Sequence, residues 1–201
     1  QILPRHLADA ALYAVNTGCR EQEVCQLRWD WEVDVPDMET SIFILPESIT
    51  KTSTERVVVL NTIARRVIES RRGIHKEYVF TYRGNPVGKL NNTAWKRAWK
   101  KAKLPTEQGI LRGVHNLRHS FGRRLRGAGI PLETRKALLG HAHSDITTHY
   151  SAAELSELLE AVDKIVDRGI AQTPTLTVVQ RSKKVVGKLS ENEKGLTAEN
   201  G

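Results

Sequence analysis

The sequence predicts an α+β fold, mainly α-helical, in which helices pack around a small three-stranded antiparallel sheet. Apolar residues recur at helical spacing over most of the 201-residue chain. Three short runs rich in Val and Ile interrupt this pattern between residues 31 and 60, and turn-forming residues separate them. Hydrophobic residues make up 39% of the chain, which is enough for the core of one domain.

The first sixty residues are expected to form two helices followed by the sheet. The first helix carries an apolar stripe and is broken by Gly18, and the second runs from Glu21 to Trp29. The predicted strands are 31–35, 41–45 and 56–60. A polar stretch between the last two strands predicts a turn around Lys51.

The remainder of the domain is expected to be helical. An amphipathic helix with Ile63, Val67 and Ile68 ends at Gly73, and the segment 84–86, Gly-Asn-Pro, is predicted to be a turn. The later predicted helices are 91–103, 115–127, 131–139 and one with an apolar stripe over 155–165.

A change in composition after Gly169 divides the chain. We expect residues 1–169 to form the folded domain and residues 170–201 to form a tail with one strand at 175–180, the rest being polar and mobile. Because the chain opens directly in a helical pattern, we expect a fragment of a longer protein. It contains no apolar run of about 18 residues and no charged-then-apolar leader, which predicts neither a membrane span nor secretion.

The net charge of +8 and the isoelectric point of about 9.7 favour a polyanionic partner, most often nucleic acid. The two cysteines, Cys19 and Cys25, fit neither a disulfide framework nor a zinc pattern. We expect both to lie along one helix as small hydrophobic residues, reduced in a cytosol.

Four polar clusters could carry chemistry, and the first two lie near the sheet. Arg20 follows a glycine break and shares a helix face with Glu23. The pair is either a surface ion pair of little energy or an arginine that a carboxylate holds toward a phosphate. Lys51 is either a solvated turn residue or a mobile proton donor for a leaving oxygen.

The other two clusters lie in the later helices. His115 and Arg118 share a helix face, either as a solvated basic surface or as a phosphate-binding arginine beside a proton carrier. Gly140 lets the chain turn after a helix and presents His141 at the break. Tyr150 follows nine positions later. Taken alone it is an ordinary amphipathic tyrosine, but among these cations it is a candidate nucleophile for phosphate.

The order of these clusters resembles that of the tyrosine recombinases, or phage integrases. The shared features are Arg20 with Glu23, a hairpin lysine, His-x-x-Arg, Leu-Leu-Gly-His and a tyrosine nine residues later. The resemblance covers residues 3 to 165 approximately and implies that residues 1–169 adopt the DNA breaking-rejoining catalytic fold of that family.

The resemblance also implies a reaction. Tyr150 would attack a DNA phosphodiester, displace a 5′-hydroxyl and leave a 3′-phosphotyrosine. Because that link conserves the bond energy, rejoining would need no ATP, and no cofactor or metal is implied. Arg20 and Arg118 would clamp the non-bridging oxygens where charge builds in the transition state.

The remaining roles concern protons and orientation. Lys51 would protonate the leaving 5′-oxygen, and His115 would take the proton of the phenol. His141 would hydrogen-bond the phosphate, and Glu23 would orient Arg20.

Zinc is an alternative for His115 and His119, which lie at i and i+4. Arg118 lies between them and disfavours a cation, so we expect no metal. We expect His119, His143 and His149 to be packing or capping residues.

The helix predicted at 91–103 is strongly basic. Lys96, Arg97 and Lys100 are expected to contact DNA phosphates. Trp95 and Trp99 lie at i and i+4 and are most simply core residues.

The resemblance implies double-stranded DNA as the partner, with a homo-tetramer on synapsed DNA in the full-length protein and a monomer for the isolated domain. It implies a cytoplasmic protein of bacterial or phage origin. Two alternatives are a type IB topoisomerase and a catalytically silent DNA-binding relative.

Overall fold

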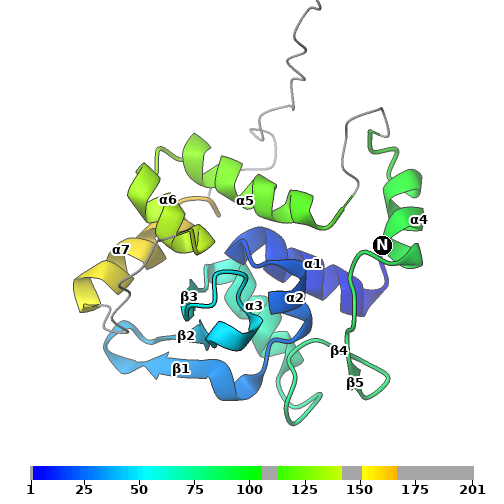
Figure 1. The fold of residues 1–201 in the computed structure, drawn as a ribbon, viewed down its shortest axis with the longest axis horizontal. Coiled ribbons are helices and arrows are strands. Elements are labelled where there is room, and N and C mark those ends of the chain that lie inside the picture. The colour runs from blue at the N-terminus through cyan, green and yellow to red at the C-terminus, as the bar shows by residue number, and fades with distance from the viewer. Residues whose placement is uncertain (1, 106–112, 142–150, 167–201) are drawn as a thin grey trace, which may run out of the picture.

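The computed structural model describes residues 2–105, 113–141 and 151–166 (Figure 1). As expected, it is mainly helical with one three-stranded sheet. The helices are α1 (Arg5–Thr17), α2 (Glu21–Cys25), α3 (Thr62–Arg71), α4 (Thr93–Lys101), α5 (His115–Gly127), α6 (Leu132–Leu139) and α7 (Ala152–Asp163). The strands are β1 (Glu32–Val35), β2 (Thr40–Leu45), β3 (Arg56–Val59), β4 (Thr81–Tyr82) and β5 (Asn85–Pro86). Short 3₁₀ turns are η1 (Trp29–Trp31), η2 (Pro36–Met38) and η3 (Glu47–Ile49).

The sheet has the order β1-β2-β3 with antiparallel neighbours, and its strands β2 and β3 carry buried apolar residues on both faces. Successive residues of β2 point to opposite faces: Phe43 and Leu45 join one buried cluster and Ile42 joins another. Val58 lies opposite Phe43 and Val59 opposite Ile42, so the register carries the same division into β3. Strands β2 and β3 are therefore covered on both sides.

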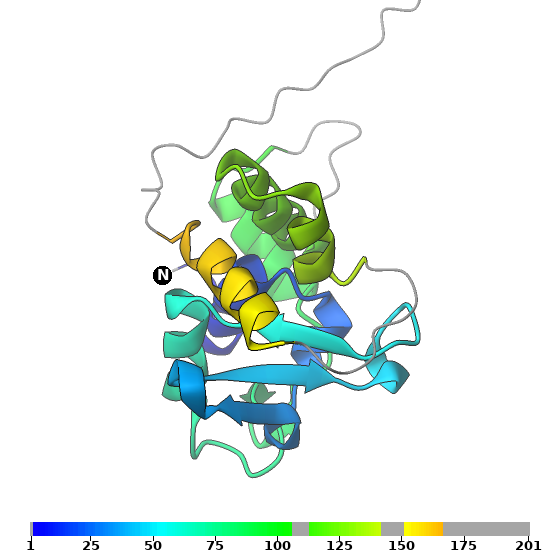
Figure 2. The ribbon, with the colours of Figure 1, turned by 90° about the vertical axis from the view of Figure 1, so that its left-hand side faces the viewer.

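Two groups of helices cover the two faces of β2 and β3. One hydrophobic cluster joins α1, α2, α3 and α4 to the sheet and includes the fully buried Tyr13 and Phe80. The other cluster joins α5, α6 and α7, with Phe121 and Leu125 of α5 at its centre. Figure 2 shows α7 crossing beside the sheet, where it packs against β3 and α6.

The end of α1 lies directly against α5 because residue 18 is glycine. Gly18 caps α1 in the left-handed conformation, with φ of 66°. A Cβ at this position would lie 2.5 Å from Cδ1 of Phe121 and 3.2 Å from Cδ2 of Leu139. Any side chain here would therefore clash with the Phe121 ring, and it would also strain the backbone because of the positive φ. This close approach brings the start of α2 beneath α5.

The helix expected at 21–29 is shorter than predicted. It ends at Cys25, and Arg28 is extended and forms an isolated bridge with Tyr78. The expectation that both thiols share a helix is also wrong, because Cys19 lies in the connection that precedes α2. Both cysteines are buried, and burial raises the pKa of the Cys25 thiol to about 12.

Other boundaries differ by a few residues. In the segment predicted as a turn at 84–86, Gly84 turns with φ of 77°, while Asn85–Pro86 pair back onto Thr81–Tyr82 as β5. The helix α4 is shorter than the predicted 91–103 because the side chain of Asn92 caps it, accepting the Trp95 N–H at 3.2 Å.

The predicted tail, residues 170–201 with its strand at 175–180, lies outside the described residues. Within the described ranges, every helix is too short or too polar to cross a bilayer.

Candidate functional site

The first part of the site is built where α2 begins. Arg20 is the N-cap residue of α2, and Glu23 accepts its backbone N–H at 2.7 Å and its Nη1 at 2.8 Å. The predicted Arg20–Glu23 pair is therefore present. It is not a surface ion pair, because Glu23 has 0% exposure. Glu23 holds Arg20 through both backbone and side chain.

A second arginine, Arg56, shares the same carboxylate. It opens β3, is 4% exposed and donates Nη1 to Glu23 Oε2. Its Nη2 donates to the carbonyl of Leu138 at 2.9 Å, so that it links β3 to the end of α6. Gly140 makes room for it, because a Cβ at residue 140 would lie 2.7 Å from Arg56 Cδ.

Glu23 is ionised in this environment. Burial by itself raises the pKa of a carboxyl group, but the Arg56 guanidinium and the hydrogen bonds from Arg20 outweigh that effect. The net pKa of Glu23 lies below its usual value. The sequence predicts no role for Arg56, because an arginine at the start of a Val-rich strand looks like an ordinary charged residue at a strand end.

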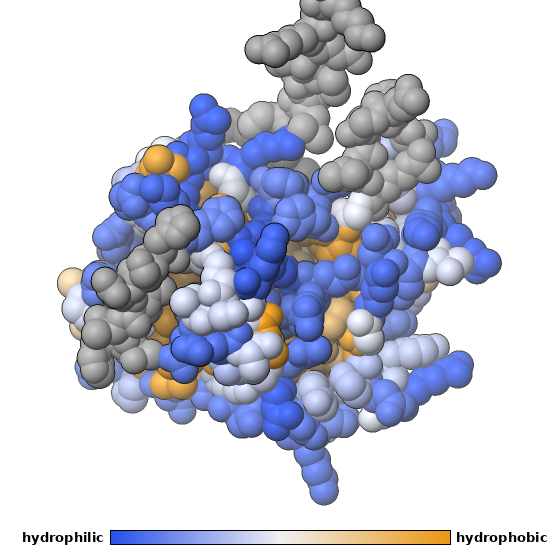
Figure 3. Space-filling model, in the orientation of Figure 1, coloured by the Kyte–Doolittle hydropathy of each residue, from blue (hydrophilic) through white to orange (hydrophobic). Residues whose placement is uncertain are grey.

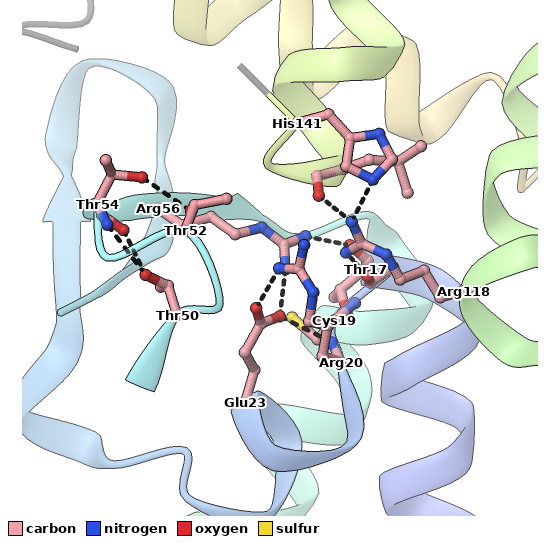
Figure 4. Close-up of polar contacts among 12 residues, drawn as sticks. Thr17, Cys19, Arg20, Glu23, Thr50, Thr52, Thr54, Arg56, Arg118 and His141 are labelled. Carbon is pink, nitrogen blue, oxygen red and sulfur yellow. Dashed lines mark hydrogen bonds and ion pairs between the residues drawn. The ribbon is translucent and has the colours of Figure 1, made fainter. Parts of the chain in front are cut away.

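Arg118 reaches the site from α5 on the opposite side (Figure 4). It is 4% exposed and donates to the carbonyl of Gly18 at 2.6 Å and to the carbonyl of Leu139. Its Nη2 lies 2.9 Å from Nε2 of His141, which places the acceptor nitrogen of that ring toward the arginine. Arg118 is therefore held rigidly between the end of α1 and the end of α6.

Burial and neighbouring cations lower the pKa of both members of this contact. For Arg118 the pKa falls to about 10, through burial first and then through Arg56 and Arg20. For His141 the causes are burial and then Arg118, and its pKa also lies below the usual value. Because the pocket is cationic, the binding of an anion in it lowers the free energy.

Lys51 lies in the predicted turn between β2 and β3. Thr50 organises the turn: its hydroxyl donates to the carbonyl of Thr54 at 2.7 Å and accepts the Thr54 N–H at 3.2 Å. Lys51 itself is exposed and lines the same groove as Arg20 and Arg118. The turn thus places the exposed ammonium of Lys51 at the cationic pocket.

His115 and His119 occupy consecutive turns of α5. Both are exposed, and their rings meet edge to face with centroids 4.6 Å apart. The expectation that His119 is a packing or capping residue is wrong, because it is exposed and lines the groove. Burial lowers the pKa of His115, and His119, Arg118, Arg20 and Lys51 lower it further by charge repulsion.

We therefore expect His115 to be neutral at pH 7 in the DNA-free protein. Titration of its imidazole by NMR should give a midpoint below the unperturbed value of about 6.5. His119→Gln removes one of the neighbours that lower the pKa of His115 and should move that midpoint upward. A midpoint above 6.5 in the wild type would contradict the electrostatics of the groove. Since only the neutral ring accepts a proton, a reaction that uses it as a base should slow as the pH falls through this pKa.

Six of the side chains described above, those of Arg20, Lys51, His115, Arg118, His119 and His141, line one open groove of about 670 Å³. Its described lining carries cations and imidazoles and no carboxylate, and consists of Arg20, Lys51, His115, Arg118, His119, Gly122, Arg123, Arg126, Arg135, Leu139 and His141. Figure 3 shows the face of Figure 1 as largely hydrophilic, with hydrophobic colour confined to small patches. Five of the predicted site residues thus converge, while Tyr150 lies outside the described residues.

The predicted DNA-binding residues of α4 lie apart from this groove. Lys96, Arg97 and Lys100 are exposed and line neither of the two described grooves. Trp95 is buried and Trp99 is partly buried against the same cluster, which confirms their expected place in the core. A second groove of about 1000 Å³ shares Arg20 and Lys51 with the first and continues along α2 and β5.

Sequence comparisons place the chain beside known DNA recombinases. The family described as "Phage integrase family" matches residues 3–157. The integrase of Salmonella phage P22 is 25% identical over 172 residues, which cover 79% of this chain and 42% of that protein. Tyrosine recombinase XerA of Pyrococcus horikoshii is 28% identical over 158 residues, covering 76% of this chain and 52% of that protein. The chain thus spans about half the length of these curated relatives.

Structural comparisons bear on the fold. The XerH site-specific recombinase bound to difH substrate superposes with a TM-score of 0.52 at 22% identity, covering 75% of this chain and 45% of that one. The Tn1549 transposon integrase in complex with transposon right end DNA gives a TM-score of 0.50 at 23% identity, covering 76% and 57%. The predicted fold class is confirmed.

Proposed function

This chain belongs to the phage integrase family, and from that premise we propose that it breaks and rejoins DNA in site-specific recombination through a 3′-phosphotyrosine link. One observation carries the proposal: Arg20, Arg118 and His141 meet Lys51 and His115 in a groove whose described lining has no carboxylate. A phosphodiester in this groove would have the charge that builds on its oxygens compensated by fixed donors, without a metal ion.

In the proposed cleavage step, Oη of Tyr150 attacks the phosphorus and the bond from phosphorus to the 5′-oxygen breaks. The phenol proton passes to His115, whose lowered pKa leaves it neutral and able to accept. Lys51 donates a proton to the departing 5′-oxygen, and the mobility of an exposed turn lysine suits that role. Rejoining runs the same steps in reverse.

The fixed groups stabilise the transition state. Arg20 and Arg118 bind the non-bridging oxygens, and His141 adds a hydrogen bond on the side of Arg118. Glu23 positions Arg20 from beneath the groove, since it is fully buried and holds both its backbone and its guanidinium.

We propose double-stranded DNA as the partner, with Lys96, Arg97 and Lys100 of α4 contacting its backbone phosphates. The exposure of all three side chains supports this. The acting form would be a homo-tetramer on synapsed DNA in a bacterial cytoplasm, with the isolated domain a monomer.

A nicked duplex tests the function. The DNA should carry the recombination site, which is to be sought as a direct repeat in the sequence that flanks the gene, with a nick that lets the released strand diffuse away after cleavage. The protein is expected to form an SDS-resistant, protease-sensitive adduct at the 3′-phosphate. Tight binding without adduct would instead indicate a silent DNA-binding relative. Relaxation of any supercoiled plasmid, without preference for the repeat, would indicate a type IB topoisomerase.

A further inference from the structure

The groove contains more cations than the proposed reaction uses. On α5, His115, His119, Arg123 and Arg126 all line it and recur at the spacing of one helix face. Arg135 lines it from the neighbouring helix α6. The three arginines Arg123, Arg126 and Arg135 therefore extend the cationic lining beyond the five residues assigned to catalysis.

These arginines have no evident structural task. Arg123 and Arg126 are exposed, and neither forms an ion pair or hydrogen bond with the described residues. The Nε of Arg135 is buried and has no hydrogen-bond partner in the described part of the chain. Arg124, on another face of α5, differs: it donates to the carbonyl of Val15 at 3.1 Å and that of Ile165 at 3.0 Å.

A glycine interrupts this face of α5 in the middle. Gly122 lines the groove, although glycine weakens a helix interior. Packing does not require it, because a Cβ there would meet only Cδ1 of Leu139 at 3.5 Å, an ordinary contact. Because glycine has no side chain, there is space for an extended ligand strand to lie close to the helix between His119 and Arg123.

We propose that Arg123, Arg126 and Arg135 bind the DNA backbone phosphates that flank the scissile phosphate, an inference that rests on the proposed function. From His115 to Arg126 the α5 face is about 17 Å long at the usual helical rise. A DNA strand carries a phosphate for about every 3.4 Å of its axis, so this face can contact several phosphates in succession. Guanidinium groups suit the task because they bind phosphate oxygens in a fork.

The salt dependence of DNA binding tests the proposed role of these arginines. In the Tyr150→Phe background, which keeps binding reversible, Arg123→Gln with Arg126→Gln should weaken binding to the nicked duplex about tenfold or more at low salt. The slope of log affinity against log salt should fall by about 0.9 for each phosphate that the variant no longer neutralises. Arg66→Gln is the control for the loss of a positive charge, because it removes one such charge from an exposed site on α3 outside both described grooves.

Substitution of single phosphates by neutral methylphosphonates identifies the phosphates that these arginines bind. Placed one at a time beside the scissile position, they should weaken binding of the protein with its arginines intact, and at one or two positions should have no further effect on the Arg123→Gln/Arg126→Gln protein. Two results would overturn the proposed role of these arginines. One is a slope of log affinity against log salt equal to that of Arg66→Gln. The other is equal sensitivity of the intact and the Arg123→Gln/Arg126→Gln proteins at every methylphosphonate. Wild-type protein that binds without forming adduct would overturn the proposed function alone, since the slopes stay measurable.

Discussion

The Tyr150→Phe protein is expected to form no covalent adduct on the nicked duplex under conditions in which the wild type does. The substitution deletes one oxygen atom, the proposed nucleophile, and leaves the aromatic ring. Deletion of a nucleophile in other enzymes lowers the rate by more than about 10⁴-fold, which places any residual adduct below detection. Binding to the intact duplex should be unchanged, so the loss would be one of chemistry.

Tyr78→Phe is the matched control. Of the four tyrosines in the chain, Tyr13 is fully buried and Tyr82 stacks on His6, while Tyr78 lines the second groove near Arg20. The Tyr78→Phe protein should form adduct at the wild-type rate. An adduct of undiminished yield from Tyr150→Phe would show that another residue is the nucleophile.

Glu23→Gln is expected to lower the free energy of unfolding by about 3–5 kcal/mol, the usual cost of removing one partner from a buried ion pair. The reason is that Arg56, only 4% exposed, would keep its charge and lose its carboxylate. Chemical denaturation followed by tryptophan fluorescence measures the change. Glu133→Gln is the control, because Glu133 has an 81% exposed side chain paired with Lys136 and should cost no more than about 1 kcal/mol. Equal losses in the two variants would contradict the buried pair.

The pH dependence gives this prediction a sign. The folded-state pKa of Glu23 lies below its ordinary value of 4.5, so its contribution is fully present above the unfolded pKa and disappears as the pH falls through the folded pKa. The difference between wild type and Glu23→Gln should therefore be largest near neutrality and shrink in acid. A difference that grows in acid would contradict the lowered pKa.

A double substitution separates stability from catalysis. Replacing both Glu23 and Arg56 with methionine removes the buried charges together, and such replacements often restore stability. Adduct formation should nonetheless stay impaired, because Arg20 loses the carboxylate that orients it. Recovery of both stability and full cleavage rate would contradict the positioning role of Glu23.

Local pattern was sufficient for most of the fold. The helix at 115–127 and the three strands were predicted to within a residue because spacing of apolar residues depends only on nearby sequence. The helix after Arg20 was predicted too long, since its end is set by the pairing of Arg28 with Tyr78, fifty residues away. Contacts of that range leave no periodic signal.

The candidate site divides in the same way. The sequence by itself determined the elements and, through the resemblance, the identity and order of Arg20, Lys51, His115, Arg118 and His141. Only the tertiary structure decided that Arg56 shares the carboxylate of Glu23, and that Arg118 donates to a carbonyl 100 residues away. Local spacing specifies which side chains share a helix face, but burial, partners and pKa depend on which distant backbone folds against that face.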